Sequence, residues 1–213
     1  MKTHLAPPSR EFDAGEFALV IALAFGLSIL GSLAAALDYT GRPIEFGDAQ
    51  IASAMVYEAI IAPIVWLVLR RRGWKWSDFA VYASKGSTIF GILVALGVLA
   101  VWYAFEAAFG KVPATLTATV PWVVAISIVN PVFEEMLVLG YVVQALRGRF
   151  GLTAAFNVSV AIRLLYHLYQ GPLAVIPIAF FGLVVTFVYV RMGRLWPAIV
   201  AHGILDFVGL TWD

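Results

Sequence analysis

The segment NPVFEEMLVLG (Asn130–Gly140) lies inside a longer apolar run, Pro121–Leu146. A helix needs about 20 predominantly apolar residues to cross a bilayer, so this run predicts a membrane-spanning helix. It nevertheless carries two adjacent carboxylates, Glu134 and Glu135. One ionised carboxylate near the bilayer midplane costs roughly 2.5–3.5 kcal/mol on insertion scales. Two acids in such a position therefore indicate a functional site rather than a purely structural feature.

The composition of the whole chain agrees with a membrane protein. Of its 213 residues, 62% are hydrophobic and only 13% are charged, whereas soluble domains carry about 25% charged residues. The net charge of +1 gives no bulk attraction to nucleic acid, so we expect the lipid bilayer as a partner and no nucleic acid. The chain has no cysteine, which excludes disulfides, thiolate metal sites and a cysteine nucleophile.

Hydropathy predicts an all-α protein, a polytopic membrane helical bundle with about seven transmembrane helices. Residues 1–213 are expected to form a single membrane-embedded domain, because neither a repeat nor a separate soluble region is evident. The predicted spans are approximately Phe17–Leu37, Ile51–Leu69, Thr88–Phe109, Pro121–Leu146, Thr153–Tyr169, Leu173–Val190 and Leu195–Leu210.

The distribution of Lys and Arg predicts that the N-terminus lies inside. With that orientation the outer loops keep only Arg42 and Lys111, and Arg163 falls within the fifth span. The inner segments hold the other eleven of the fourteen basic residues: Lys2, Arg10, Arg70, Arg71, Arg72, Lys75, Lys85, Arg147, Arg149, Arg191 and Arg194.

Eight ionisable residues remain within the predicted spans. They are Glu58, Glu106, Glu134, Glu135, Arg163, His167, His202 and Asp206. Ionisable groups inside a membrane are by default a functional-site hypothesis. Glu106 lies near a span end and is expected to be interfacial, whereas Glu58 has no evident companion and is interpreted as structural or substrate-lining.

Spacing relates these residues to one another. His202 and Asp206 are four residues apart and share one helix face, so Asp206 is expected to orient the imidazole or to ligate an ion with it. Glu134 and Glu135 diverge by about 100° around their helix. One is expected to face a cavity, while the other pairs elsewhere, with Arg163 as its partner. Pro131 removes a backbone hydrogen bond one turn earlier.

Each feature also has a structural interpretation. The Glu pair could bridge helices, and an intramembrane His, such as His167, is often a helix–helix hydrogen bond. The pair formed by His202 and Asp206 is no more specific when taken alone. The functional interpretation rests on the occurrence of several ionisable residues in apolar spans within one 75-residue stretch.

Three segments together resemble a known family. EEMLVLGY, RLLYHLYQG and HGILD are similar to the EExxxR, FxxxH and HxxxN/D motifs of the CAAX protease and bacteriocin-processing family, also called the Abi or type II prenyl endopeptidase family. The resemblance covers about residues 130–208, the expected catalytic core. It implies that Glu134, Glu135, His167, His202 and Asp206 are catalytic, with Arg163 supporting them.

Two positions depart from the family pattern. The arginine of the first motif should stand at Leu139, and the phenylalanine of the second should stand at Arg163. We expect the cation to have moved to a neighbouring helix, where it could still pair with a glutamate.

The resemblance implies an intramembrane endopeptidase that hydrolyses a membrane-associated, in some cases prenylated, protein or peptide. Glu134 is expected to take a proton from water, with His167 near that water. His202, held by Asp206, would stabilise the oxyanion, and Glu135 would hold Arg163. No cofactor is required by this scheme, although zinc bound by Glu134, His167 and His202 is an alternative.

Two other functions stay open from the residues alone. One is a non-catalytic membrane scaffold or bacteriocin-immunity protein of the same fold, which the absent arginine favours. The other is a proton-coupled transporter, since intramembrane Glu and His can relay protons. The compact length and the style of the motifs indicate a prokaryotic cytoplasmic membrane.

Overall fold

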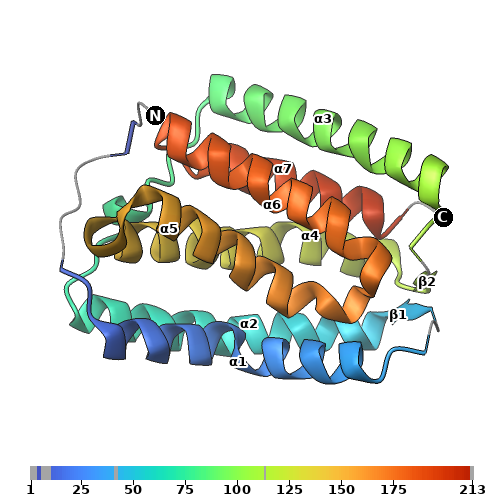
Figure 1. The fold of residues 1–213 in the computed structure, drawn as a ribbon, viewed down its shortest axis with the longest axis horizontal. Helices are drawn as coiled ribbons and strands as arrows, with labels where there is room; N and C mark the ends of the chain where they lie inside the picture. The colour runs from blue at the N-terminus through green and yellow to red at the C-terminus, as the bar shows by residue number, and fades with distance from the viewer. Residues whose placement is uncertain (1–3, 6–10, 41–42, 113, 212–213) are drawn as a thin grey trace.

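The computed structural model describes residues 4–5, 11–40, 43–112 and 114–211. Three of the basic residues used for the orientation argument, Lys2, Arg10 and Arg42, lie outside these ranges. The chain folds into a bundle of helices (Figure 1). The α-helices are α1 (Ala14–Leu37), α2 (Asp48–Arg71), α3 (Lys85–Phe109), α4 (Val120–Glu135), α5 (Val142–His167), α6 (Pro172–Met192) and α7 (Trp196–Gly209).

The all-α, polytopic membrane prediction is confirmed, and every predicted span corresponds to helix. Among the described residues, five helices are long and apolar enough to cross a membrane. One of them is the continuous stretch Val120–Gln170, which contains the predicted fourth and fifth spans. These two spans are separated at Gly151, whose φ of 82° is not helical. The last helix, α7, has 14 residues and is shorter than a usual span.

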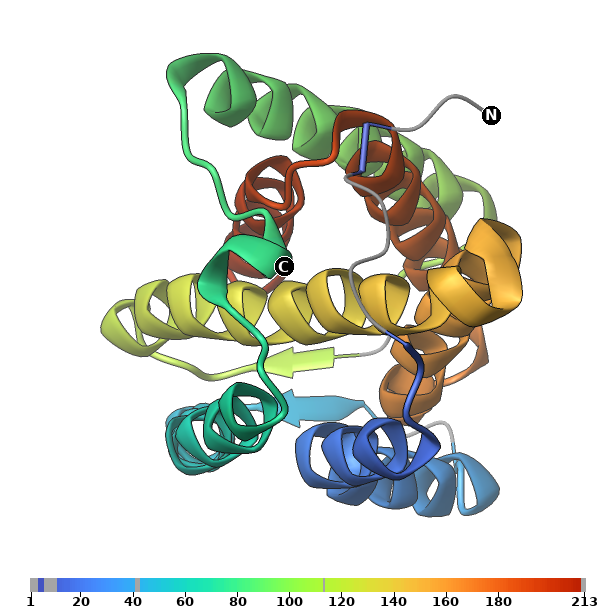
Figure 2. The ribbon, with the colours of Figure 1, turned by 90° about the vertical axis from the view of Figure 1, so that its left-hand side faces the viewer.

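The helices form layers around α4. In Figure 2, α4 lies across the picture, with α1 and α2 below it and α6 and α7 above it. Helix α4 packs against α2 on one side and α7 on the other, and α7 in turn packs against α3. The segment between residues 120 and 170 therefore forms the centre of the molecule, and the first two helices cover one side of it.

Two short strands depart from the purely helical expectation. Strands β1 (Ile44–Phe46) and β2 (Ala114–Leu116) pair in parallel, with Ile44 opposite Ala114. The segments before α2 and before α4 lie side by side at one end of the bundle (Figure 1). Their backbone groups pair with each other there, and Asp48 adds hydrogen bonds to the backbone and hydroxyl of Thr119.

The opposite end of the bundle carries the basic segments. The start of α1, the end of α2, the start of α3, the end of α6 and the start of α7 all lie on the left of Figure 1. Arg72, just after α2, donates to Asp13, which caps α1. The backbone N–H of Glu16 donates to the Asp13 carboxylate and lowers its pKa. Because basic residues flank these helix ends, positive charge gathers at one end of the bundle, as the N-inside prediction requires. The orientation itself stays a prediction.

The central helix is irregular beside its two acids. Helix α4 passes through Pro131 and is followed by a π-helical turn, Met136–Tyr141. Such π-turns are rare and often occur at functional sites. A π-turn disturbs the usual backbone pairing, and the hydroxyl of Ser159 donates to the carbonyl of Val138 within it at 2.8 Å. The acids of the first motif are therefore placed between a proline and a π-turn.

A close helix crossing fixes α7 against this region. Pro131 lacks the N–H that would bond the carbonyl of Ser127, four residues earlier. That carbonyl would lie 2.6 Å from a Cβ placed on Gly203 of α7. Only glycine therefore allows α7 to approach α4 at this point, one residue after His202.

Replacing Gly203 with alanine should destabilise the bundle by about 1–3 kcal/mol, because the new methyl group would meet rigid backbone at the crossing. Thermal unfolding in detergent micelles, followed by circular dichroism, measures the change. Gly209→Ala is the matched control in the same helix, since nothing lies within 4 Å of a Cβ placed on Gly209. Equal unfolding temperatures for the two variants would contradict this account of the crossing.

Candidate active site

The two adjacent acids end α4 and point into the bundle. Glu134 is 8% exposed and Glu135 is fully buried. Their divergence around the helix gives them closest contacts that differ, although both lie near Arg163 and His202. Glu135 contacts Arg163 of α5 and His202 of α7, whereas Glu134 lies between His167 and His202. The structure thus brings both motif-one glutamates into one polar cluster.

Arg163 provides the buried cation of this cluster. Its Nη2 lies 2.7 Å from both carboxylate oxygens of Glu135, and the pairing expected from the sequence is present. The guanidinium also lies over the Phe181 ring, 4.9 Å from its centroid. Gly182 leaves room for the Arg163 side chain, because a Cβ there would lie 3.2 Å from Cδ. Leu139, where the family has arginine, is an apolar and fully buried side chain.

His202 lies between two carboxylates. Its Nδ1 is 2.7 Å from Oε1 of Glu135, and its Nε2 is 3.3 Å from Oδ1 of Asp206. Because Glu135 already accepts from Arg163, its carboxylate acts as an acceptor and Nδ1 of His202 is the donor. From the sequence, Asp206 alone is expected to hold His202. In the structure Glu135 makes the shorter contact, since it projects from a neighbouring helix directly at the ring.

Glu134 faces both imidazoles across a gap. Its Oε2 lies 3.9 Å from Nε2 of His167 and 3.9 Å from Nε2 of His202. These separations exceed a direct hydrogen bond, and polar groups at such distances are commonly bridged by a water molecule. Arg163 Nη1 lies 3.6 Å from the same oxygen. A carboxylate, two imidazoles and a guanidinium therefore converge on one point.

Sequence reasoning missed two residues that complete this cluster. The Tyr166 hydroxyl donates to Oε2 of Glu134 at 2.6 Å, and the Asn130 amide donates to Asp206 at 3.1 Å. Tyr166 directly precedes His167 and follows Arg163 by three residues, so helical spacing alone could have placed it with Arg163. Asn130 lies one turn before Glu134, but its partner is on α7 and nothing local in the sequence predicts that contact.

His167 is the most accessible of the catalytic candidates apart from Asp206. Its side chain is 18% exposed, compared with 5% for His202 and 21% for Asp206. The Nδ1 atom lies 3.2 Å from the Gln170 amide, and this contact directs Nε2 towards Glu134. Gln170 belongs to a short 3-10 turn, Leu168–Gln170, that ends α5 before Gly171. The local turn therefore sets the orientation of the ring.

The same atoms allow the zinc alternative to be tested against the geometry. Zinc would need a lone pair on Nε2 of His202 and on Nε2 of His167, together with an oxygen of Glu134. Both nitrogens of His202, however, face carboxylate oxygens, an arrangement that suits a ring donating from each nitrogen. Within the described residues, no group of three or more His, Cys, Asp or Glu is arranged to hold a metal ion.

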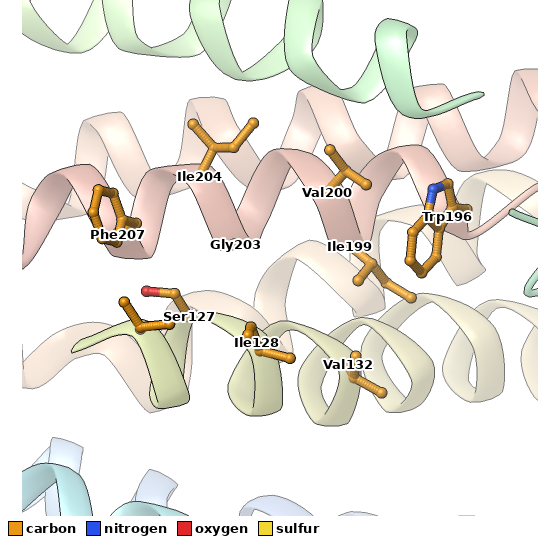
Figure 3. Close-up of a pocket in the computed structure, with 10 residues that line it drawn as sticks. Ser127, Ile128, Val132, Trp196, Ile199, Val200, Gly203, Ile204 and Phe207 are labelled. Carbon is orange, nitrogen blue, oxygen red and sulfur yellow. The ribbon is translucent and has the colours of Figure 1, made fainter. Parts of the chain in front are cut away.

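An apolar groove lies beside the cluster, between α4 and α7. Figure 3 shows its lining, in which Gly203 separates the side chains of Phe207 and Ile199 on α7. The groove has a volume of about 440 Å³. Ser127 contributes a hydroxyl oxygen and Trp196 an indole nitrogen, among apolar neighbours such as Ile128 and Val132. An apolar surface therefore adjoins the helix turn that carries His202.

Replacing Arg163 with leucine should destabilise the protein by about 3–5 kcal/mol, because Glu135 would remain as an uncompensated buried charge. The double variant Arg163→Leu with Glu135→Leu should be more stable than the single Arg163 variant, since both charges are removed. Unfolding in detergent of all four members of this cycle measures the coupling between the two side chains. If the free energy of unfolding of the double variant falls by the sum of the decreases in the two single variants, the ion pair has no special role in folding.

The arrangement of these residues agrees with the comparison of the chain with protein families. Residues 113–208 match the family described as type II CAAX prenyl endopeptidase Rce1-like. No curated protein and no solved structure matches the chain. The match contains all three motifs and every residue of the polar cluster described above. Over residues 113–208 the chain is therefore similar to the Rce1-like type II CAAX prenyl endopeptidases, as the three motifs in the sequence indicated.

Proposed function

We propose that this protein is an intramembrane endopeptidase that hydrolyses a peptide bond of a membrane-associated protein or peptide. The observation that carries the proposal is the convergence of Glu134 Oε2 with Nε2 of His167 and Nε2 of His202, each 3.9 Å away. A water molecule in this gap would contact a general base and two imidazoles at once. Such a site has the components that peptide hydrolysis requires.

Glu134 acts as the general base in this proposal. It removes a proton from the water as the water oxygen attacks the peptide carbonyl, and it later returns that proton to the leaving amine as the C–N bond breaks. General acid–base catalysis of this kind contributes about 10²–10⁴-fold to the rate. The Tyr166 hydroxyl, which donates to the same carboxylate, holds the oxygen in position. His167 lies on the opposite side of the water and orients it.

His202 stabilises the oxyanion. Its Nδ1–H is engaged by Glu135, so donation to the substrate must come from Nε2. The ring carries both protons when it does so, and the two flanking carboxylates of Glu135 and Asp206 balance its charge. Loss of one oxyanion donor typically lowers the rate about 10²–10³-fold. Arg163 keeps Glu135 in the position that this arrangement needs.

The family match supports a prenylated peptide as the first substrate to test. The description of the family names a prenyl endopeptidase, and the groove between α4 and α7 offers apolar surface beside His202. We propose that the N-terminus lies inside, since the basic segments gather at one end of the bundle. We further propose a prokaryotic cytoplasmic membrane, as the compact length and the style of the motifs indicate. Arg163 also supplies a cation to Glu135, so the absence of arginine at Leu139 no longer favours a non-catalytic scaffold.

Single substitutions of the site should abolish cleavage of a fluorescent farnesylated CAAX peptide. We expect Glu134→Gln, His167→Ala and His202→Ala each to lower kcat/KM at least about 100-fold, because each removes a group in contact with the reacting water or carbonyl. The assay uses purified full-length protein in lipid nanodiscs. Glu106→Gln is the control, since the Glu106 carboxylate accepts a hydrogen bond from Trp102 on the same helix, α3, which carries none of the site residues. Full activity in all three site variants would overturn the proposed mechanism.

Metal analysis separates the two chemical versions of the reaction. Because both nitrogens of His202 face carboxylates, we expect cleavage to persist after treatment with EDTA and the purified protein to contain zinc well below one ion per chain. Mass spectrometry of the wild type and of His167→Ala measures the metal content. Stoichiometric zinc that disappears in the His167 variant, together with chelator-sensitive cleavage, would establish the zinc alternative instead.

A further inference from the structure

A third glutamate lies near the site but outside the matched region. Glu58 lies in the middle of α2, the helix that packs against α4. Its side chain is only 6% exposed. It lies close enough to Glu134, Asp206 and His202 to interact with each of them electrostatically. The mechanism above uses none of its atoms, although it lies near three residues of the catalytic cluster.

Glu58 is also incompletely satisfied. Its Oε2 is buried and has no hydrogen-bond partner within the described part of the chain. Buried carboxyl oxygens are normally paired, and each exception calls for an explanation. The guanidinium of the site does not supply the partner: Nη2 of Arg163 donates to Glu135, and its Nε and Nη1 likewise have no hydrogen-bond partner among the described residues. An acceptor is therefore held ready beside the catalytic residues with no donor from the described residues.

A peptide substrate brings the donors that this acceptor lacks. Each residue of an extended peptide carries a backbone N–H, and leaving that group unpaired in a membrane interior is costly. The neighbouring carboxylates Glu134 and Asp206 add negative potential, which attracts a donor and disfavours an acidic side chain. The chemistry thus favours a donor over another acceptor, and the backbone N–H groups close to the scissile bond are donors that every peptide substrate carries.

The geometry points to Glu58 as a substrate-binding residue whose carboxyl oxygen accepts a hydrogen bond from a backbone N–H of the peptide next to the bond that Glu134 attacks. This inference rests on the proposed endopeptidase function. It assigns a role in the site to α2, which lies outside residues 113–208. The role of Glu58 is in binding and alignment, and the proton transfers stay with Glu134.

Two substitutions of Glu58 test this role in nanodiscs with the fluorescent farnesylated CAAX peptide. Glu58→Leu removes the acceptor and should raise KM about tenfold, the equivalent of one hydrogen bond, while kcat changes less than about twofold. Glu58→Gln keeps a carbonyl acceptor and should restore KM to within about threefold of the wild type. Glu58→Leu should also unfold at the same or a higher temperature, because Oε2 has no hydrogen-bond partner among the described residues that the substitution would remove.

The neighbouring Tyr57 provides the control. Its hydroxyl donates to the carbonyls of Leu23 and Ala24 on α1, so Tyr57→Phe weakens the packing of α2 without touching the cluster. We expect KM to stay at the wild-type value in this variant. The inference is overturned if KM is unchanged in Glu58→Leu. It is also overturned if the unfolding temperature of this variant falls as it would after the loss of a structural contact.

Direct binding distinguishes failure of this inference from failure of the proposed function. Fluorescence anisotropy of the same peptide with Glu134→Gln protein measures Kd without cleavage. Adding Glu58→Leu to this variant should weaken binding about tenfold. If the wild type cleaves and Kd is unchanged, only the role of Glu58 is wrong. If the wild type does not cleave but Kd rises as expected, the endopeptidase proposal fails and Glu58 is still a peptide-binding residue. If the peptide does not bind at all, both the endopeptidase proposal and the role of Glu58 are overturned.

Discussion

The guanidinium of Arg163 is held in the interior of a helical bundle, and Glu135 is the carboxylate that meets it most closely. Both side chains are fully buried, so each would be strongly unfavourable without the other. The pair extends further, because His202 donates to the same carboxylate. One side chain at the end of α4 thus joins α5 and α7. The relative positions of all other groups in the site follow from this three-helix connection.

Glu134 acquires its surroundings as a consequence of that connection. Adjacent residues on a helix diverge by about 100°, so fixing Glu135 on Arg163 directs Glu134 towards the two imidazoles and Tyr166. The proline before the acids and the π-turn after them alter the backbone on both sides of this point. Ser159 satisfies a carbonyl in the π-turn, and Gly203 lets α7 close over the region. The irregular backbone is therefore compensated by contacts from the neighbouring helices.

The site is polar within a bundle whose outer surface is largely apolar. Figure 1 shows that the helices which carry its residues, α4, α5 and α7, are covered by α1 and α2 on one side and by α3 on the other. The first two helices lie outside the family match, yet α2 brings Glu58 close to the cluster. The N-terminal half therefore contributes more than a hydrophobic cover, because part of the electrostatic environment of the candidate catalytic residues comes from it.

Much of this protein follows from the sequence alone, because membrane helices are determined by local composition. Apolar runs of sufficient length had to be helical to satisfy their backbone in lipid, and breakers such as Gly151 marked where they ended. The acids and imidazoles were recognisable because charged groups are rare in such runs. The spacing in HGILD placed His202 and Asp206 on one face, and the divergence of the two glutamates separated their roles.

Only the tertiary structure decided which of these groups meet. The contact of Glu135 with His202 joins residues 67 positions apart, and that of Asn130 with Asp206 joins residues 76 positions apart. Local periodicity carries no information about contacts between residues so far apart in the sequence, since it indicates only which residues share a face of one helix. The same limit concealed the pairing of β1 with β2 and the approach of Glu58 to the site. These contacts arise from the packing of separate helices, where shape and the need to pair buried charges select one arrangement.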